Sequence, residues 1–153
     1  MARSRVTIDF KGFKEYMEKL DNLGGTDLMK QGVEAGLKAS KQYVNEQIKK
    51  VMVKSNLPAH GQYSKGETEK SVDKDFNVKW EGTLGYTKIG FKFDKIGLLS
   101  IYLMYGTKSV HGTPRMKPVE GLYDAIYGKK TKSHIRKLQK EAINKVINRY
   151  MEG

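Results

Sequence analysis

Length and charge set the first limits on this chain. It has 153 residues, with 29 Lys and Arg against 17 Asp and Glu, and a formal net charge of +12. The length predicts one domain over residues 1–153, and the charge predicts attraction to an anionic partner or an acidic protein surface. The absence of cysteine excludes disulfides and thiolate chemistry. The three histidines lie too far apart in the sequence for a metal-ligand pattern, so we expect neither a metal nor a cofactor.

Nothing in the sequence predicts a membrane segment or a secretion signal. No apolar run approaches the roughly 20 residues that a bilayer-spanning helix needs. The first ten residues include two arginines but lack the apolar centre of a signal peptide. We therefore expect a protein that is made in a cytosol-like compartment and has no membrane partner.

The N-terminal third predicts a strand followed by two helices. Apolar residues alternate with polar ones over residues 6–10, which is typical of a short half-buried strand. Helical spacing over residues 12–23 predicts a helix closed by Gly24-Gly25. A second helix begins at Thr26 and runs to about Val53. Its apolar stripe consists of Met29, Val33, Leu37, Ser40, Val44, Ile48 and Val51, and its thin side of Gly32, Gly36 and Ala39, against which we expect close packing.

The middle of the chain predicts a flexible loop and then a β-hairpin. Residues 55–66 are polar and contain glycine and proline, so we expect a loop there, with a helical turn near residues 67–71. Alternating apolar residues over 76–81 and 88–93 predict the two hairpin strands. The connection at 82–85 starts and ends with glycine. The hairpin would have one apolar face, with Phe76, Trp80 and Phe91, and one basic face.

The C-terminal third predicts three helical segments. Residues 98–105 favour a short helix that Gly106 ends in a left-handed conformation, and residues 119–126 favour a short amphipathic helix. A basic helix is expected over about 133–151. Its predicted core stripe is Ile135, Leu138, Ala142, Val146 and Tyr150. The resulting fold class is α+β: a small antiparallel sheet, made of the N-terminal strand and the central hairpin, packed against a long helix, with a C-terminal helix.

Catalytic motifs are missing from the sequence. A phosphate-binding loop of the G-x-x-x-x-G-K-[ST] type is not present, and Pro114 removes a backbone donor from the glycine-bearing segment that comes nearest to it. There is no G-x-S-x-G, and no histidine has an acidic residue at a telling distance. We therefore expect that the protein is not an enzyme.

Nucleic-acid binding is the main alternative that the charge leaves open. The C-terminal helix could lie along a phosphate backbone, and Trp80, Phe91 and Phe93 could stack on bases. However, the basic residues are spread over nearly every element, and no known DNA- or RNA-binding motif appears. Aromatic residues that alternate along a hairpin more often face the core. A basic nucleic-acid-binding accessory protein therefore stays the second hypothesis.

Residues 102–118 form the most unusual segment of the sequence. Two Gly-Thr pairs and two prolines shape the backbone, while apolar side chains stand between cations. This combination favours a protein-docking surface, although an ordinary crossover loop is the simpler alternative. The predicted interface residues are Tyr102, Tyr105, Gly106, Thr107, Val110, Pro114, Met116 and Pro118. A second predicted set, in the loop before residue 67, is Pro58, Gly61, Tyr63 and Gly66.

Three stretches of this sequence resemble one known family. They are "GFKEYMEKL" at 12–20, "GETEKSV" at 66–72, and "YLMYGT" at 102–107 followed by "PRMKPVEGLYDAI" at 114–126. In order and spacing, over residues 8–127, they are similar to motifs of the tail-completion (head–tail joining, minor tail) proteins of long-tailed bacteriophages. Two positions depart from the family pattern. Thr68 stands where the family favours leucine, and Met104 stands where it favours glutamate.

The resemblance implies a virion structural protein without enzymatic activity. Such a protein closes the head-proximal end of the tail as a ring, expected to be a hexamer, and joins it to the head connector. The implied partners are further copies of the chain, the tail tube protein and a head-closure protein, with DNA passing nearby without sequence-specific binding. The implied location is the tail or neck of the virion, after synthesis in the host cytoplasm. In this interpretation residues 102–118 are a contact surface.

Overall fold

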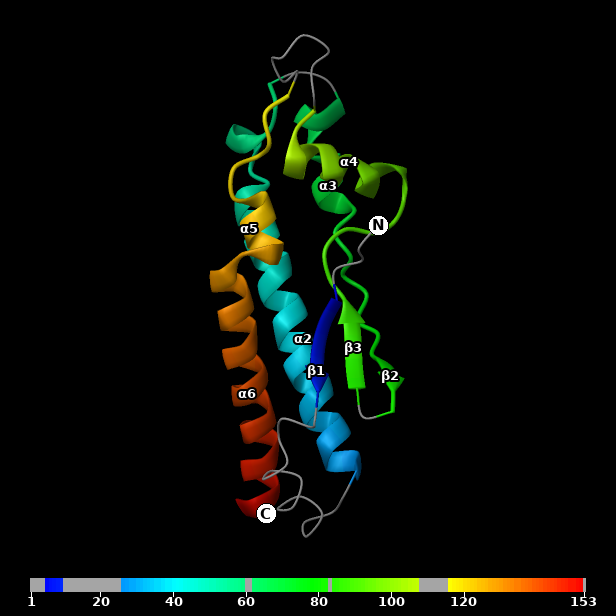
Figure 1. The fold of residues 1–153 in the computed structure, drawn as a ribbon, viewed down its shortest axis with the longest axis vertical. Helices are drawn as coiled ribbons and strands as arrows, with labels where there is room; N and C mark the ends of the chain where they lie inside the picture. The colour runs from blue at the N-terminus through cyan, green and yellow to red at the C-terminus, as the bar shows by residue number, and fades with distance from the viewer. Residues whose placement is uncertain (1–4, 10–25, 60–61, 83, 108–115, 153) are drawn as a thin grey trace. The chain divides into compact units, whose positions relative to one another are not determined.

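The computed structural model describes residues 5–9, 26–59, 62–82, 84–107 and 116–152 (Figure 1). The helix expected over residues 12–23 lies outside these ranges. The chain divides into two compact units: unit 1 holds residues 1–43, 75–88 and 133–153, and unit 2 holds residues 44–74 and 89–132. Helices α2 (Thr26–Val51) and α6 (Lys129–Glu152) each supply residues to both units. The expectation of one domain stays a prediction.

Unit 1 contains a small antiparallel sheet, which confirms the α+β class. Its strands are β1 (Arg5–Asp9), β2 (Lys79–Glu81) and β3 (Leu84–Lys88), in the order β1-β3-β2. Val6 pairs with Thr87 across β1 and β3, and Trp80 pairs with Gly85 across β2 and β3. The predicted N-terminal strand is therefore present, and it pairs with the predicted hairpin.

The second hairpin strand lies earlier in the chain than the sequence predicted. β3 ends at Lys88, where the predicted strand was to begin. The hairpin turns tightly after β2 at Gly82, which has φ +62. Gly90, at φ +98, interrupts the expected strand over 88–93, and Phe93 is 74% exposed. The predicted division into an apolar and a basic hairpin face is wrong for this reason: of the three large apolar residues of the second run, Ile89 is buried, Phe91 is half-buried and Phe93 is exposed.

Helix α2 packs against both the sheet and α6 within unit 1. A Cβ atom on Gly85 of β3 would lie 2.9 Å from Val33 Cγ1, so the strand passes very close to α2. A Cβ on Gly32 would lie 3.6 Å from Ile143, which confirms that the thin side of α2 has a close neighbour. The buried apolar residues of unit 1 are Val6, Leu28, Met29, Val33, Leu37, Tyr86, Ile135, Ile143 and Ile147.

The buried face of α6 differs from the predicted stripe. Its buried positions after the first turn are Ile135, Gln139, Ile143 and Ile147, which repeat every four residues. Such a row drifts around a helix of 3.6 residues per turn, and rows of this spacing form the ridges that pack into the grooves of a neighbouring helix. The predicted Leu138, Ala142 and Val146 are half-buried at the margin of this row, and Tyr150 is 50% exposed.

Unit 2 consists mainly of short helices around the C-terminal end of α2, from Val44 onward. In chain order these are two 3-10 turns, η2 (Lys54–Asn56) and η3 (Gln62–Lys65), then α3 (Glu67–Lys70), α4 (Lys95–Tyr105) and α5 (Leu122–Tyr127). The turns η2 and η3 lie where a plain loop was expected, whereas α3 to α5 match the predicted helices. The buried apolar residues of this unit are Val44, Ile48, Met52, Val72, Ile89, Leu103, Val119, Leu122, Ala125 and Ile126.

Candidate docking surface on α4 and α5

Helix α4 begins at a side-chain cap and a close backbone contact. The Asp94 carboxylate accepts a hydrogen bond from the Gly97 amide at 2.5 Å, which satisfies one of the free N–H groups of the first turn. A Cβ on Gly97 would lie only 1.8 Å from the Lys92 carbonyl oxygen, so no larger residue fits there. Ser100 Oγ donates to the Gly97 carbonyl. One side of α4 is therefore held firmly against the preceding chain.

Gly106 ends α4 in a conformation that glycine alone adopts readily. Its backbone angles are φ 73 and ψ −176, and its N–H donates to the Tyr102 carbonyl at 2.7 Å. The predicted positive φ is confirmed, but the ψ angle places the residue in the extended glycine-only region and not in the left-handed helical one. A Cβ here would lie 2.7 Å from the Met116 carbonyl oxygen. The site therefore requires glycine for two separate reasons.

The chain returns to α4 immediately after this turn. The Thr107 amide donates to the Met116 carbonyl at 3.0 Å, within an isolated antiparallel bridge between the two residues. The Val119 amide then donates to the Leu103 carbonyl at 2.7 Å. The two predicted flanks of the docking segment are thus joined to each other through backbone groups. The side chains of Leu103 and Val119 are buried at this junction, whereas those of Thr107 and Met116 are half-buried.

Helix α5 adds a second layer beside the end of α4. Gly121 precedes it in the left-handed conformation, at φ 82, and Leu122, Ala125 and Ile126 are buried. The hydroxyl of Thr131 donates to the Asp124 carbonyl at 2.7 Å, which fixes the corner between α5 and α6. With its apolar face buried, α5 turns Tyr123 outward.

Four tyrosines gather on the outer side of these two helices. Tyr105 and Tyr123 meet edge to face with ring centroids 5.9 Å apart, and Tyr123 and Tyr127 lie 5.1 Å apart. Tyr102 precedes Tyr105 by three residues, so the two share a side of α4. Tyr105 is 62% exposed, and Tyr102 and Tyr123 are each 47% exposed. We call Tyr102, Tyr105, Tyr123 and Tyr127 the tyrosine surface.

The α4 part of the tyrosine surface carries no charge. No charged residue occurs between Ile96 and Thr107 in the sequence, in a chain with a net charge of +12. Burial among neighbouring groups, and then the negative charge that Tyr127 and Tyr123 acquire on ionisation, raise the pKa of Tyr105 above 10.0. The Tyr105 phenol is therefore neutral at physiological pH. It can contribute apolar area and hydrogen bonds, but not an anionic nucleophile.

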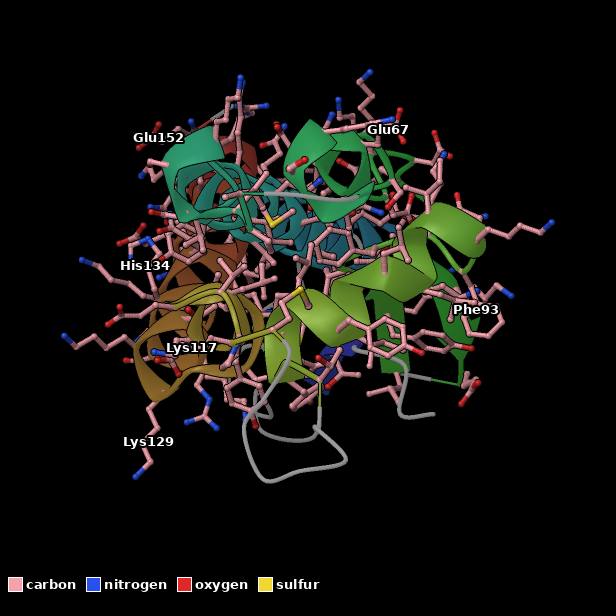
Figure 2. The ribbon with its side chains drawn as sticks, turned by 90° about the horizontal axis from the view of Figure 1, so that it is seen from above. Glu67, Phe93, Lys117, Lys129, His134 and Glu152 are labelled. Atoms are coloured by element: carbon pink, nitrogen blue, oxygen red, sulfur yellow. The ribbon has the colours of Figure 1, made fainter. Side chains whose placement is uncertain are left out.

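Exposed apolar residues also occur at the start of α4. Phe93 projects from the chain just before the helix (Figure 2), and Ile96 is exposed in its first turn. From the sequence, Phe93 was expected in a hairpin strand, and Ile96, Tyr123 and Tyr127 were not among the predicted interface residues. Helical spacing could have indicated both tyrosines of α5, because Tyr123 stands on the helix predicted over 119–126 and Tyr127 follows it by four residues, directly after that range.

The predicted interface residues are only partly within the described ranges. Val110 and Pro114 lie outside them. Gly106, Thr107 and Met116 are half-buried and adjacent, Pro118 is exposed, and Tyr102 and Tyr105 belong to the tyrosine surface. The Thr107 hydroxyl is buried without a hydrogen-bond partner among the described residues. Their role in an interface stays a prediction.

The residues predicted in the loop before residue 67 are less well placed for a contact. Pro58 is half-buried, and Gly66 adopts the left-handed conformation at φ 70, directly before α3. Gly61 and the side chain of Tyr63 lie outside what the structure describes. This second set therefore adds no surface of its own to the argument, and its role stays a prediction.

The part of the chain that the structure describes contains neither a metal-binding cluster nor a membrane-spanning helix. Within the described ranges, no group of three or more His, Cys, Asp or Glu could hold a metal ion. No helix in these ranges has both the length and the apolar character needed to cross a bilayer.

Comparisons of the chain with protein-family models, with curated proteins and with solved structures found no match.

Proposed function

We propose that this chain is a non-enzymatic structural subunit of a bacteriophage virion. In this proposal it forms a ring, expected to be a hexamer, that closes the head-proximal end of a tail and joins the tail to the head connector. The observation that carries the proposal is the tyrosine surface, whose α4 part is exposed and carries no charge. It lies in the segment whose sequence resembles the tail-completion proteins, and it is bordered by a glycine-only turn.

The chemistry of the tyrosine surface suits contact with protein. Aromatic side chains bury about 150–250 Å² each and carry a polar tip that tolerates both water and an interface. Tyrosine is also enriched among the residues that contribute most to binding energy. A standard interface buries about 800 Å² per partner, so the tyrosines of this surface could supply much of its centre. Neighbouring side chains would complete the polar rim.

The net charge favours this surface as the place where copies meet. Subunits with a charge of +12 repel one another, and the repulsion is smallest where the facing surfaces carry no cations. The charge-free run of α4 meets that condition. Because salt screens the remaining repulsion, self-association should become stronger as the salt concentration rises. Binding to an anionic partner would show the opposite dependence.

The direct test is the mass of the assembly, measured by size-exclusion chromatography with light scattering. Tyr105→Glu places a charge in the centre of the tyrosine surface, so we expect it to shift the protein to monomers in salt that supports wild-type association. Tyr150→Glu is the matched control, since Tyr150 is a similarly exposed tyrosine of α6 in unit 1. The control should associate like the wild type. Equal association of wild type and Tyr105→Glu would contradict the proposed surface.

A further inference from the structure

The outer side of α6 in unit 1 is strongly basic. Arg136, Lys137, Lys140, Lys145 and Arg149 are all exposed, and we call them the basic face. They lie opposite or beside the buried row that faces α2. The exposed row of Lys137, Glu141, Lys145 and Arg149 follows the same four-residue spacing as the buried row, so it stays outward over several turns, and Glu141 is its acidic member. The cations are thus held along one side of a packed helix.

Few carboxylates neutralise this basic face. The part of α6 in unit 1 contains only two acidic residues, Glu141 and Glu152. Lys137 lies 3.8 Å from Glu141, in an exposed pair of the kind that contributes little stability. Within the part of the chain that the structure describes, Arg136, Lys140, Lys145 and Arg149 form no ion pair. The face therefore has an excess of positive charge, with its five cations against two carboxylates.

The basic face lacks the groups that recognise unpaired bases. From Ser133 to Arg149 the sequence contains no Phe, Tyr or Trp, and single-strand binding depends on such stacking platforms. His134 is engaged with the ring of Tyr43, with centroids 4.2 Å apart. The feature of a nucleic acid that the basic face can bind is therefore the negative charge of its phosphates. The apolar side of α6 is already buried against α2, so it is not available for insertion into a lipid surface.

We propose that the basic face of α6 binds the phosphate backbone of double-stranded DNA without reading its sequence. Each cation that neutralises a phosphate releases a counterion, so the logarithm of affinity falls by roughly 0.9 per contact for each unit of log salt. The unpaired cations of the face therefore predict a slope of about −3 to −4 for one subunit. The affinity should be that of non-specific binding, with Kd of about 10⁻⁴–10⁻⁶ M near physiological salt. The proposal does not depend on ring formation.

The test is a titration of a short mixed-sequence duplex, followed by fluorescence anisotropy, at salt concentrations from about 50 to about 200 mM. The double variant Arg136→Gln/Lys140→Gln should weaken binding and lower the magnitude of the slope by about 2, or roughly one per cation. The control double variant Lys30→Gln/Lys38→Gln removes the same charge from exposed positions of α2 in the same unit. The control should keep nearly the whole slope.

Three outcomes would overturn the proposal. In the first, the slope of log affinity against log salt falls by the same amount in both double variants. That result would mean that net charge and not the basic face governs binding. In the second, one duplex is strongly preferred over another of equal length and different sequence. In the third, vesicles with anionic headgroups bind through Arg136 and Lys140 while the duplex does not. Circular dichroism of each variant shows that its helices are intact, so lost binding cannot be attributed to unfolding.

Discussion

Gly106 offers the sharpest test of the docking segment's construction. Its conformation, φ 73 and ψ −176, costs other residues about 1–3 kcal/mol. A Cβ at this position would also lie 2.7 Å from the Met116 carbonyl oxygen and 3.1 Å from Pro118 Cδ. The first of these contacts is with backbone that also accepts the Thr107 hydrogen bond, so it cannot move freely. Relieving such overpacking costs about 1–3 kcal/mol.

The two contributions together predict that Gly106→Ala lowers the free energy of unfolding by about 3 kcal/mol or more. For a chain of this length each kcal/mol lowers Tm by about 2–4 °C. We therefore expect a fall in Tm of about 6–12 °C, measured by thermal melting under circular dichroism.

Gly66→Ala is the matched control in the same unit. Gly66 also has a positive φ, at +70, but a Cβ there would meet no atom within 4 Å. Only the left-handed conformation is then costly, at about 1–2 kcal/mol, and Tm should fall by about 2–8 °C, less than for Gly106→Ala. If the two variants melt at the same temperature, the close contact between Gly106 and Met116 does not contribute as we argue.

Three further predictions concern stability, assembly and protease sensitivity. Gly32→Ala should raise the free energy of unfolding by up to about 1 kcal/mol, because alanine favours the helix and its Cβ would lie at an ordinary contact distance of 3.6 Å from Ile143. A lower Tm for this variant would show that α2 and α6 pack too tightly to accept the added methyl group. Met116→Asp should melt within a few degrees of the wild type yet fail to assemble, because the contact between subunits would bury an unpaired charge. Normal incorporation of this variant into rings would identify residues 102–118 as an ordinary crossover loop. Free subunits should be cut first within Ser55–Lys65 in limited proteolysis and protected there on assembly, and equal cleavage in both forms would refute this.

The sequence predicted best the elements with long or locally determined patterns. The helical spacing of α2 continues over seven positions, and five of them, from Val33 to Ile48, are among the fully buried residues of the core. Gly106 could be recognised because a glycine directly after an apolar helical run commonly ends a helix with positive φ. In both cases the information lies in neighbouring residues.

The predictions from sequence were wrong where tertiary packing determined which of two similar local patterns forms the element. Residues 88–93 alternate like a strand, but Gly90 bends the chain, and the shorter run at β3 pairs with β1 instead. In α6 two apolar rows compete, and packing against α2 selected the row that contains Ile143 and leaves Tyr150 exposed. The tyrosine surface was found only in part because Tyr105 and Tyr123 meet across two helices that are far apart in the sequence. No local pattern predicts such a contact.

The central claim is that this chain assembles into a ring at the end of a phage tail through the tyrosine surface. The most direct test is light scattering after size-exclusion chromatography, with and without the cognate tail tube protein, for the wild type and Tyr105→Glu. We expect the wild type to form a closed ring that associates with the tail tube, and Tyr105→Glu to stay monomeric under the same conditions. A wild-type protein that stays monomeric both alone and with the tail tube protein would contradict the account.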